Sequence, residues 1–101
     1  MALYTVITDY AGGTYISQVT AQGLKQVPIL WAEKLKAGSI PGVNAKSLAT
    51  FVNYYNWSQD KPTAIEGVHY VWCVSGIIRG KGLLLNIVRT STSSRAKRGR
   101  H

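Results

Sequence analysis

Side chains that could do acid–base chemistry are scarce in this chain of 101 residues. Asp9, Glu33, Asp60 and Glu66 are its only carboxylates, set against twelve lysines and arginines, and only Asp60 and Glu66 lie within twenty residues of each other. Enzymes that use carboxylates as general acid and general base bring two of them close together. The sequence therefore predicts a non-enzymatic protein with no catalytic residue.

His69 and Cys73 could in principle act as base and nucleophile, because a thiolate needs a base within hydrogen-bond reach. The segment around them predicts a β-strand, and four residues along a strand span about 13 Å at roughly 3.3 Å per residue. The two side chains could not touch there, so we interpret Cys73 as an apolar filler and His69 as a polar edge residue. With one cysteine and two histidines in the chain, ligands for a metal are too few. We expect neither a metal nor another cofactor.

The excess of basic residues gives a formal net charge of +8, but half of that excess belongs to the last seven residues. Residues 1–94 hold eight basic and four acidic groups, a net charge of +4. Positive groups of this kind can neutralise the phosphates of a nucleic acid. The candidate nucleic-acid contacts are Arg79, Lys81, Arg89, Arg95, Lys97, Arg98 and Arg100.

Four segments rich in Val, Ile, Tyr and Thr predict the strands that would position these side chains. They form two successive pairs, and each pair is joined by a short turn that contains glycine, which is typical of β-hairpins. The four segments are Leu3–Asp9, Thr14–Val19, Val68–Ile78 and Leu83–Arg89.

Two helices are predicted between the hairpins, because apolar residues there recur at spacings of three and four. The first covers Leu24–Ala37, and Pro28 fits it either within the first turn or at a kink. The second helix begins after Asn44, a plausible N-cap, and its last apolar residue is Tyr55. The polar segment Asn56–Glu66 predicts a loop.

The predicted order of elements is ββααββ. Two hairpins can join into one antiparallel sheet with both helices on one face, which is an α+β two-layer sandwich. We expect residues 1–90 to form a single compact domain and residues 91–101 to form a basic, disordered tail. The N-terminal residues lack the features of a signal peptide, and no apolar run approaches the roughly 20 residues that span a bilayer. We therefore expect a cytoplasmic protein without a membrane partner.

The third predicted strand is apolar on both sides. If helices cover only one face of the sheet, the apolar side chains on the other face stay exposed to water. A second copy of the chain or another protein would cover such a surface. One side of this strand carries Val71, Cys73 and Ile77, and the other carries the candidate interface residues Tyr70, Trp72 and Val74.

These observations predict a small binding module that acts through protein–protein contacts and self-associates, most simply as a homodimer. The alternative is a small basic nucleic-acid-binding protein that uses the second hairpin turn and the C-terminal tail. Both hypotheses place the function in surfaces and not in a catalytic pocket.

The segment from Tyr4 to Ile16, with its Gly12-Gly13 turn and a helix after it, resembles the start of HicB-like antitoxin domains. The proline-rich segment that this family carries after its second strand is absent, and the rest of the chain does not follow the family. The resemblance therefore implies an analogy of fold at the N-terminus, and no functional residue is carried over.

Overall fold

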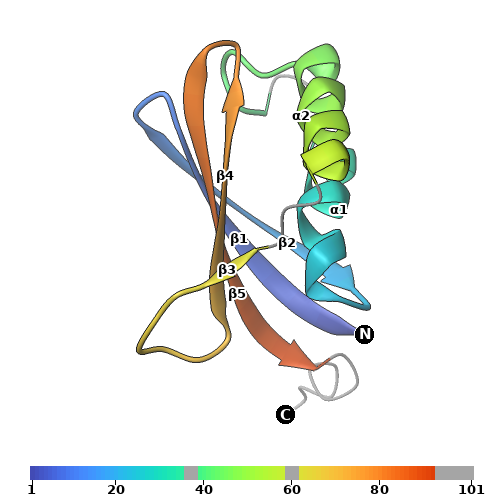
Figure 1. The fold of residues 1–101 in the computed structure, drawn as a ribbon, viewed down its shortest axis with the longest axis vertical. Helices are drawn as coiled ribbons and strands as arrows, with labels where there is room; N and C mark the ends of the chain where they lie inside the picture. Colours follow the sequence, from blue (N-terminus) through green and yellow to red (C-terminus); the bar gives the residue numbers. More distant parts are fainter. Residues whose placement is uncertain (36–38, 59–61, 93–101) are drawn as a thin grey trace.

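Five strands form one antiparallel sheet with both α-helices on the same face in the computed structural model, which describes residues 1–35, 39–58 and 62–92 (Figure 1). The sheet order is β2-β1-β5-β4-β3. Along the chain the elements are β1 (Ala2–Tyr10), β2 (Gly13–Ala21), the 3-10 turn η1 (Leu24–Gln26), α1 (Val27–Lys34), α2 (Ala45–Ser58), β3 (Thr63–Ala64), β4 (Val71–Ile78) and β5 (Lys81–Thr92). The predicted α+β class with an antiparallel sheet and two helices is confirmed.

The predicted number of four strands is wrong, because the segment expected to be a loop contains the short strand β3. Its Thr63 and Ala64 pair with Cys73 and Trp72 of β4. Two residues are too few to show the alternation that identifies a strand in a sequence. The same loop was predicted to begin at Asn56, whereas α2 continues to Ser58.

β4 begins at Val71, three residues later than predicted. The chain before it turns through Gly67 and Tyr70, whose φ angles of 89° and 63° lie in the left-handed region and are incompatible with a strand. His69 therefore lies in the β3–β4 loop and not in the strand. At the other end of the hairpin, β5 extends to Thr92, and residues 93–101 lie outside the described part of the chain.

Both predicted hairpins are present, and each is closed by a two-residue turn. Positive φ angles occur at Ala11 and Gly12 in the first turn and at Arg79 and Gly80 in the second. Two consecutive positive φ angles define the type I′ turn, whose twist matches that of the paired strands. The central strands β1 and β5, which are remote in sequence, then pair along their length and join the hairpins into one sheet.

The predicted N-cap of the second helix is confirmed. Ser47 donates its backbone N–H to Asn44 Oδ1 at 2.9 Å, and Asn44 donates its own N–H to Ser47 Oγ at 2.9 Å. These reciprocal bonds satisfy donors that the first helical turn would otherwise leave unpaired. Pro28 lies in the first turn of α1, where its missing N–H costs nothing. None of the helices in the described ranges is long and apolar enough to cross a membrane.

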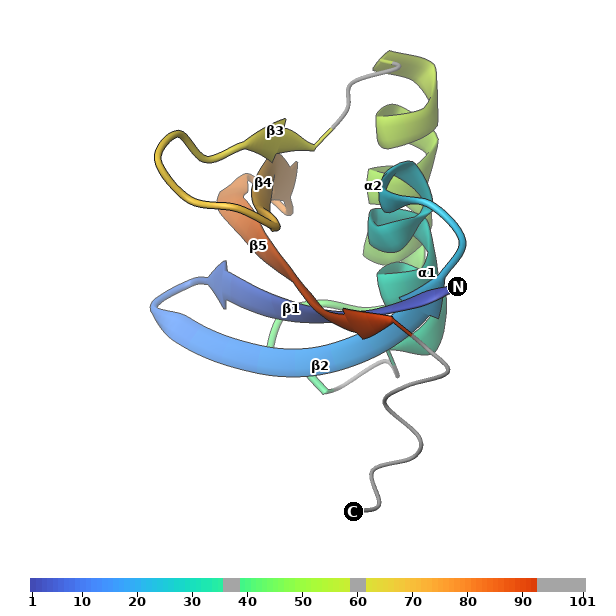
Figure 2. The same cartoon turned by 90° about the horizontal axis from the view of Figure 1, so that it is seen from below.

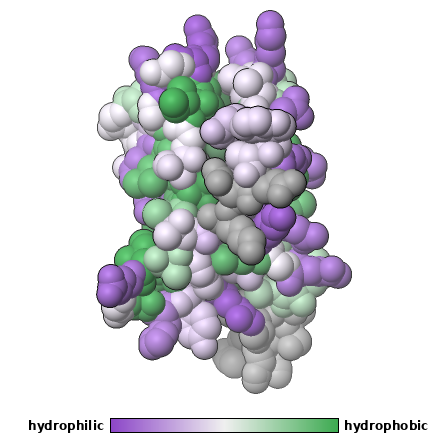
Figure 3. All heavy atoms as spheres, in the orientation of Figure 1, coloured by the Kyte–Doolittle hydropathy of each residue, from purple (hydrophilic) through white to green (hydrophobic). Residues whose placement is uncertain are grey.

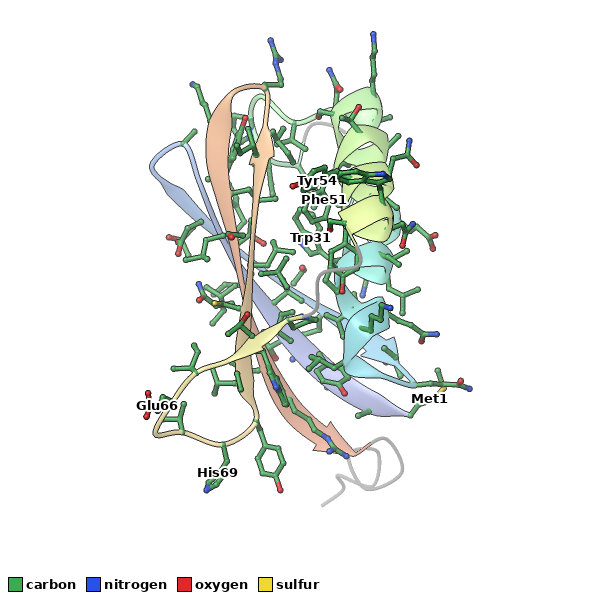
Figure 4. All side chains as sticks on the ribbon, viewed as in Figure 1. Met1, Trp31, Phe51, Tyr54, Glu66 and His69 are labelled. Carbon is green, nitrogen blue, oxygen red and sulfur yellow. The ribbon has the colours of Figure 1, made fainter. Side chains whose placement is uncertain are left out.

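The core lies between the two helices and the concave face of the curved sheet (Figure 2). Trp31 of α1 and Phe51 of α2 meet edge to face, with ring centroids 5.8 Å apart. Both rings are buried against alternate residues of the strands, among them Val6 and Leu85. Trp31 and Phe51 lie on the sides of their helices that face the sheet (Figure 4).

Gly76 of β4 permits the close approach of α2. A Cβ atom at this position would lie 2.9 Å from Phe51 Cε1 and 3.2 Å from Phe51 Cδ1, closer than carbon atoms pack. Glycine in a strand often marks such a contact between a backbone and a neighbouring element.

Replacing Gly76 by alanine is expected to lower the free energy of unfolding by about 1–3 kcal/mol, because the added methyl group must displace the Phe51 ring. Urea unfolding followed by tryptophan fluorescence would measure the change. Gly82→Ala is the matched control, since Gly82 lies in the same hairpin and a Cβ there meets nothing within 4 Å. A control variant as unstable as Gly76→Ala would contradict this explanation.

Candidate functional site

The face of the sheet opposite the helices carries a single charged residue among its described positions. We call it the open face, and strand alternation together with the register of the pairs assigns its residues. Besides Gly82, which has no side chain, they are Leu3, Thr5, Ile7, Asp9, Thr14, Ile16, Gln18, Thr20, Thr63, Val71, Cys73, Ser75, Ile77, Leu84, Asn86, Val88 and Thr90. The outer face of a solvated antiparallel sheet is normally polar, whereas eight of these seventeen side chains are apolar and only one is charged.

The single charge of the open face, on Asp9, is held within a polar network. Thr14 Oγ1 donates to Asp9 Oδ1 at 2.9 Å, and Asn86 Nδ2 donates to Asp9 Oδ2 at 3.4 Å. Nearby, Gln18 Nε2 donates to Thr5 Oγ1 at 3.0 Å. These polar groups already have partners within the molecule, which lowers the cost of covering them.

Two isoleucines make the open face apolar where it is most exposed. Ile16 of β2 has 69% of its surface exposed and stands opposite the half-buried Ile7 of β1. Ile77 of β4 is 71% exposed near the second hairpin turn. Covering these two side chains would be favourable, because it would remove apolar surface from water.

The predicted interface residues do not share one exposed surface. Val74 is only 7% exposed and faces the helices, and Trp72 is half-buried on the same side with its ring 6.4 Å from that of Tyr4. Tyr70 is exposed but lies in the β3–β4 loop, where the Arg89 guanidinium is 5.8 Å from its ring centroid. The predicted alternation along β4 is present. However, Trp72 and Val74, which were predicted to contact a partner, lie on the side of β4 that packs against the helices.

The predicted nucleic-acid contacts are not gathered into one patch in the part of the chain that the structure describes. Arg79 and Lys81 belong to the β4–β5 turn, whereas Arg89 lies eight residues along β5 from Lys81, about 26 Å at roughly 3.3 Å per residue. The remaining candidates lie outside the described residues and are Arg95, Lys97, Arg98 and Arg100.

His69 and Cys73 are not brought together as a catalytic pair. His69 is exposed in the β3–β4 loop and its ring lies 6.2 Å from that of Tyr70, whereas Cys73 is half-buried on β4 opposite Asn86. Figure 4 shows His69 and Glu66 at the far end of the molecule from Tyr54 and Phe51. Within residues 1–35, 39–58 and 62–92, no group of three or more His, Cys, Asp or Glu side chains could hold a metal ion.

The two edges of the sheet differ in a way that the sequence did not predict. At the β2 edge, Lys34 Nζ donates to the carbonyl oxygen of Gln18 at 2.6 Å. At the opposite edge, β3 pairs with only Trp72 and Cys73 of β4. The remaining half of β4, Val74–Ile78, has no neighbouring strand on that side among the described residues.

A hollow of about 520 Å³ lies between this free half of β4 and α2. We call it the edge groove, and its lining residues are Thr50, Phe51, Tyr54, Ser75, Gly76 and Ile77. Its volume falls within the range of small ligand pockets. The one sequence signal that could have indicated it is Gly76, since a glycine inside a strand often marks close packing.

Two residues with buried polar atoms line another hollow, between the first hairpin and α1. Thr8 Oγ1 and Trp31 Nε1 are buried and have no hydrogen-bond partner among the described residues. Both residues line a cavity of about 360 Å³. A buried hydroxyl group without a partner costs free energy.

No protein-family model, curated protein or solved structure matches this chain.

Thr8→Val is expected to leave the free energy of unfolding unchanged or to raise it by about 1 kcal/mol, because it replaces an unpartnered buried hydroxyl by a methyl group of the same size. Chemical unfolding would measure this. Thr5→Val is the matched control on the same strand, since Thr5 Oγ1 accepts a hydrogen bond from Gln18. A loss of more than about 1 kcal/mol in Thr8→Val would show that its hydroxyl group is satisfied.

Proposed function

We propose that this chain is a protein-binding module that acts through the open face, and that its partner there is a second copy of itself. The observation that carries the proposal is the presence of one charged residue, Asp9, among the seventeen described side chains of that face.

Charge distribution favours the open face over other surfaces for self-association. The described lysines and arginines lie on the helices, the turns or the helix-facing side of the sheet: Lys25, Lys34, Lys46, Arg79, Lys81 and Arg89. Like charges brought together at an interface cost several kcal/mol. Two copies that meet by their open faces avoid that cost.

The size and polarity of the open face also fit a contact between proteins. Its seventeen side chains approach the roughly 20–30 residues that each partner contributes to a standard interface. Apolar side chains such as Ile16 provide area to bury, while Asp9 and Asn86 already bond each other. Pairing of polar groups within one copy limits the desolvation cost of covering them.

Nucleic-acid binding finds less support in the described residues. Its contacts would have to come from opposite ends of the β4–β5 hairpin, and the open face that could stack bases carries no aromatic residue at its described positions. The alternative rests on the charge of residues 79–81 and of the C-terminal residues.

Self-association should respond to a charge placed on the open face. Ile16→Lys is expected to weaken a dimer at least roughly tenfold, because two copies of the new ammonium group would be desolvated at the interface. Sedimentation equilibrium from micromolar to millimolar concentration would measure the dissociation constant. Val68→Lys is the matched control, as Val68 is half exposed in the β3–β4 loop and lies off the open face. A wild-type chain that stays monomeric over this whole concentration range would contradict the proposal.

Binding to a generic DNA duplex is the measurement that separates the two hypotheses. The protein-binding proposal predicts that fluorescence anisotropy detects no complex at physiological ionic strength. A nucleic-acid-binding protein would bind tightly at low salt and lose affinity steeply as salt rises, by about one power of ten for each tenfold rise per phosphate contact. Binding that survives physiological salt and disappears in an Arg79→Glu, Lys81→Glu variant would favour the alternative.

A further inference from the structure

The free half of β4 presents unpaired backbone groups at the edge groove. The type I′ turn makes Ile78 and Lys81 the first pair of the β4–β5 ladder. In an antiparallel ladder the backbone groups of successive residues point alternately toward the two sides. Those of Ile78, Gly76 and Val74 therefore point to β5, and those of Ser75 and Ile77 point outward.

Contacts at the other end of β4 confirm this alternation. The N–H of Ile65 donates to the carbonyl oxygen of Val71 at 3.1 Å, so Val71 also points outward. β3 then covers β4 only as far as Cys73. Within the described residues, no strand pairs with the outward groups of Ser75 and Ile77.

The edge groove supplies apolar surface beside these backbone groups. Tyr54 of α2 is 57% exposed, and its ring lies 5.8 Å from that of the exposed Trp57. Figure 4 shows Tyr54 and Phe51 on the side of α2 that faces the sheet. In Figure 3 apolar and near-neutral residues lie between strongly hydrophilic ones, which stand at the upper end of the molecule and also along its sides and in its lower half.

One end of the edge groove is positively charged. It adjoins a second hollow of about 270 Å³, whose lining includes Lys46 and Arg79 and shares Thr50 and Ile77 with the groove. The described carboxylates, Asp9, Glu33 and Glu66, line neither hollow. A ligand of the groove would therefore meet cations without counter-charges at the end that lies beside the β4–β5 turn.

We propose that the edge groove binds an extended peptide of another protein by β-strand addition. The peptide pairs with Ser75 and Ile77, places an apolar side chain against Tyr54, and carries acidic side chains beside Lys46 and Arg79. Peptides that add to a sheet edge gain affinity from backbone hydrogen bonds and specificity from alternate side chains. This proposal does not depend on the open-face contact proposed above, although Ser75 and Ile77 border both surfaces.

Charge and direction specify the peptide further. Antiparallel addition is the favoured geometry, and it places the N-terminal end of the peptide beside Arg79, where β4 ends. Acidic residues should therefore precede the apolar ones. The last nine residues of this chain hold four basic groups and no acid, so they do not match the cationic end of the groove and another protein is the better occupant.

Titration of the full-length, isotope-labelled chain with a synthetic peptide tests the proposal. The probe is an acetylated heptapeptide with two aspartates at its N-terminal end, followed by valine and threonine alternating around a phenylalanine. Amide NMR signals of Ser75, Ile77 and Tyr54 are expected to shift. A probe with N-methyl groups on the alternate amides that face β4 should bind at least roughly tenfold more weakly, because each lost backbone hydrogen bond lowers the affinity. A probe with lysines in place of the aspartates should also bind more weakly.

Variants of the chain locate the binding. Ser75→Pro removes the outward N–H and keeps the β5 side of the strand, so it should weaken binding at least roughly tenfold, whereas Ser75→Ala should bind as the wild type does. Should Ser75→Pro fail to fold, Tyr54→Ala, at an exposed helix position, gives the same test. Ile16→Lys, on the open face, should leave peptide binding unchanged.

Three results would overturn the proposal. They are no shift at millimolar peptide, equal binding of the N-methylated probe, and shifts confined to open-face residues of other strands, such as Ile7 and Asn86. A Ser75→Pro variant that dissociates a dimer while no peptide binds would identify the edge as a contact between two copies and would also refute it.

Discussion

The edge-to-face contact of Trp31 and Phe51 over Gly76 is the constraint on which the remaining surfaces depend. It fixes α1 and α2 to each other and holds α2 against β4, where a side chain larger than hydrogen at position 76 would collide with Phe51. The hydrogen bond from Tyr10 Oη to the Ile78 carbonyl oxygen, at 2.8 Å, secures the same end of β4 to β1. Because both helices pack against one face of the sheet, no described residue covers the opposite face. On the helix side, α2 lies beside the edge of β4, and the edge groove is the space between them.

The two edges of the sheet are protected by different means. Edge strands expose backbone groups that invite pairing with other chains, and proteins commonly block them with lysine, proline or a short covering strand. At the β2 edge, Lys34 Nζ donates a hydrogen bond to the Gln18 carbonyl oxygen. At the other edge, Pro62 precedes the short strand β3. Neither device reaches Ser75 and Ile77. An unprotected stretch that borders an apolar hollow and ends at two cations has the features of a binding site.

Sequence patterns predicted the elements of this fold better than the surfaces they create. The hairpin turns and the Asn44 cap follow from local chemistry, and each was predicted from one or two residues. For Pro28 local chemistry left two placements, a first turn or a kink, and the start of α1 at Val27 decides for the first turn. The role of Val74 could not be predicted, because β4 is apolar on both sides and only the packing of α2 decides which side is buried. β3 is two residues long and exists only because it pairs with β4. The edge groove depends on contacts between Phe51 and Gly76, 25 positions apart, which no local pattern contains.

The open face and the edge groove are linked through β4, because Ile77 belongs to the first and lines the second. A strand added at Ser75 and Ile77 would extend the sheet by one strand, and its side chains would alternate between α2 and the open face. Those directed to α2 would meet the aromatic rings of the groove. Those on the other side would enlarge the open face. A charge on them would oppose the proposed self-association in the same way as the Ile16→Lys substitution. A peptide compatible with both surfaces must therefore be apolar on one side and uncharged on the other, with its acidic residues confined to the end beside Lys46 and Arg79.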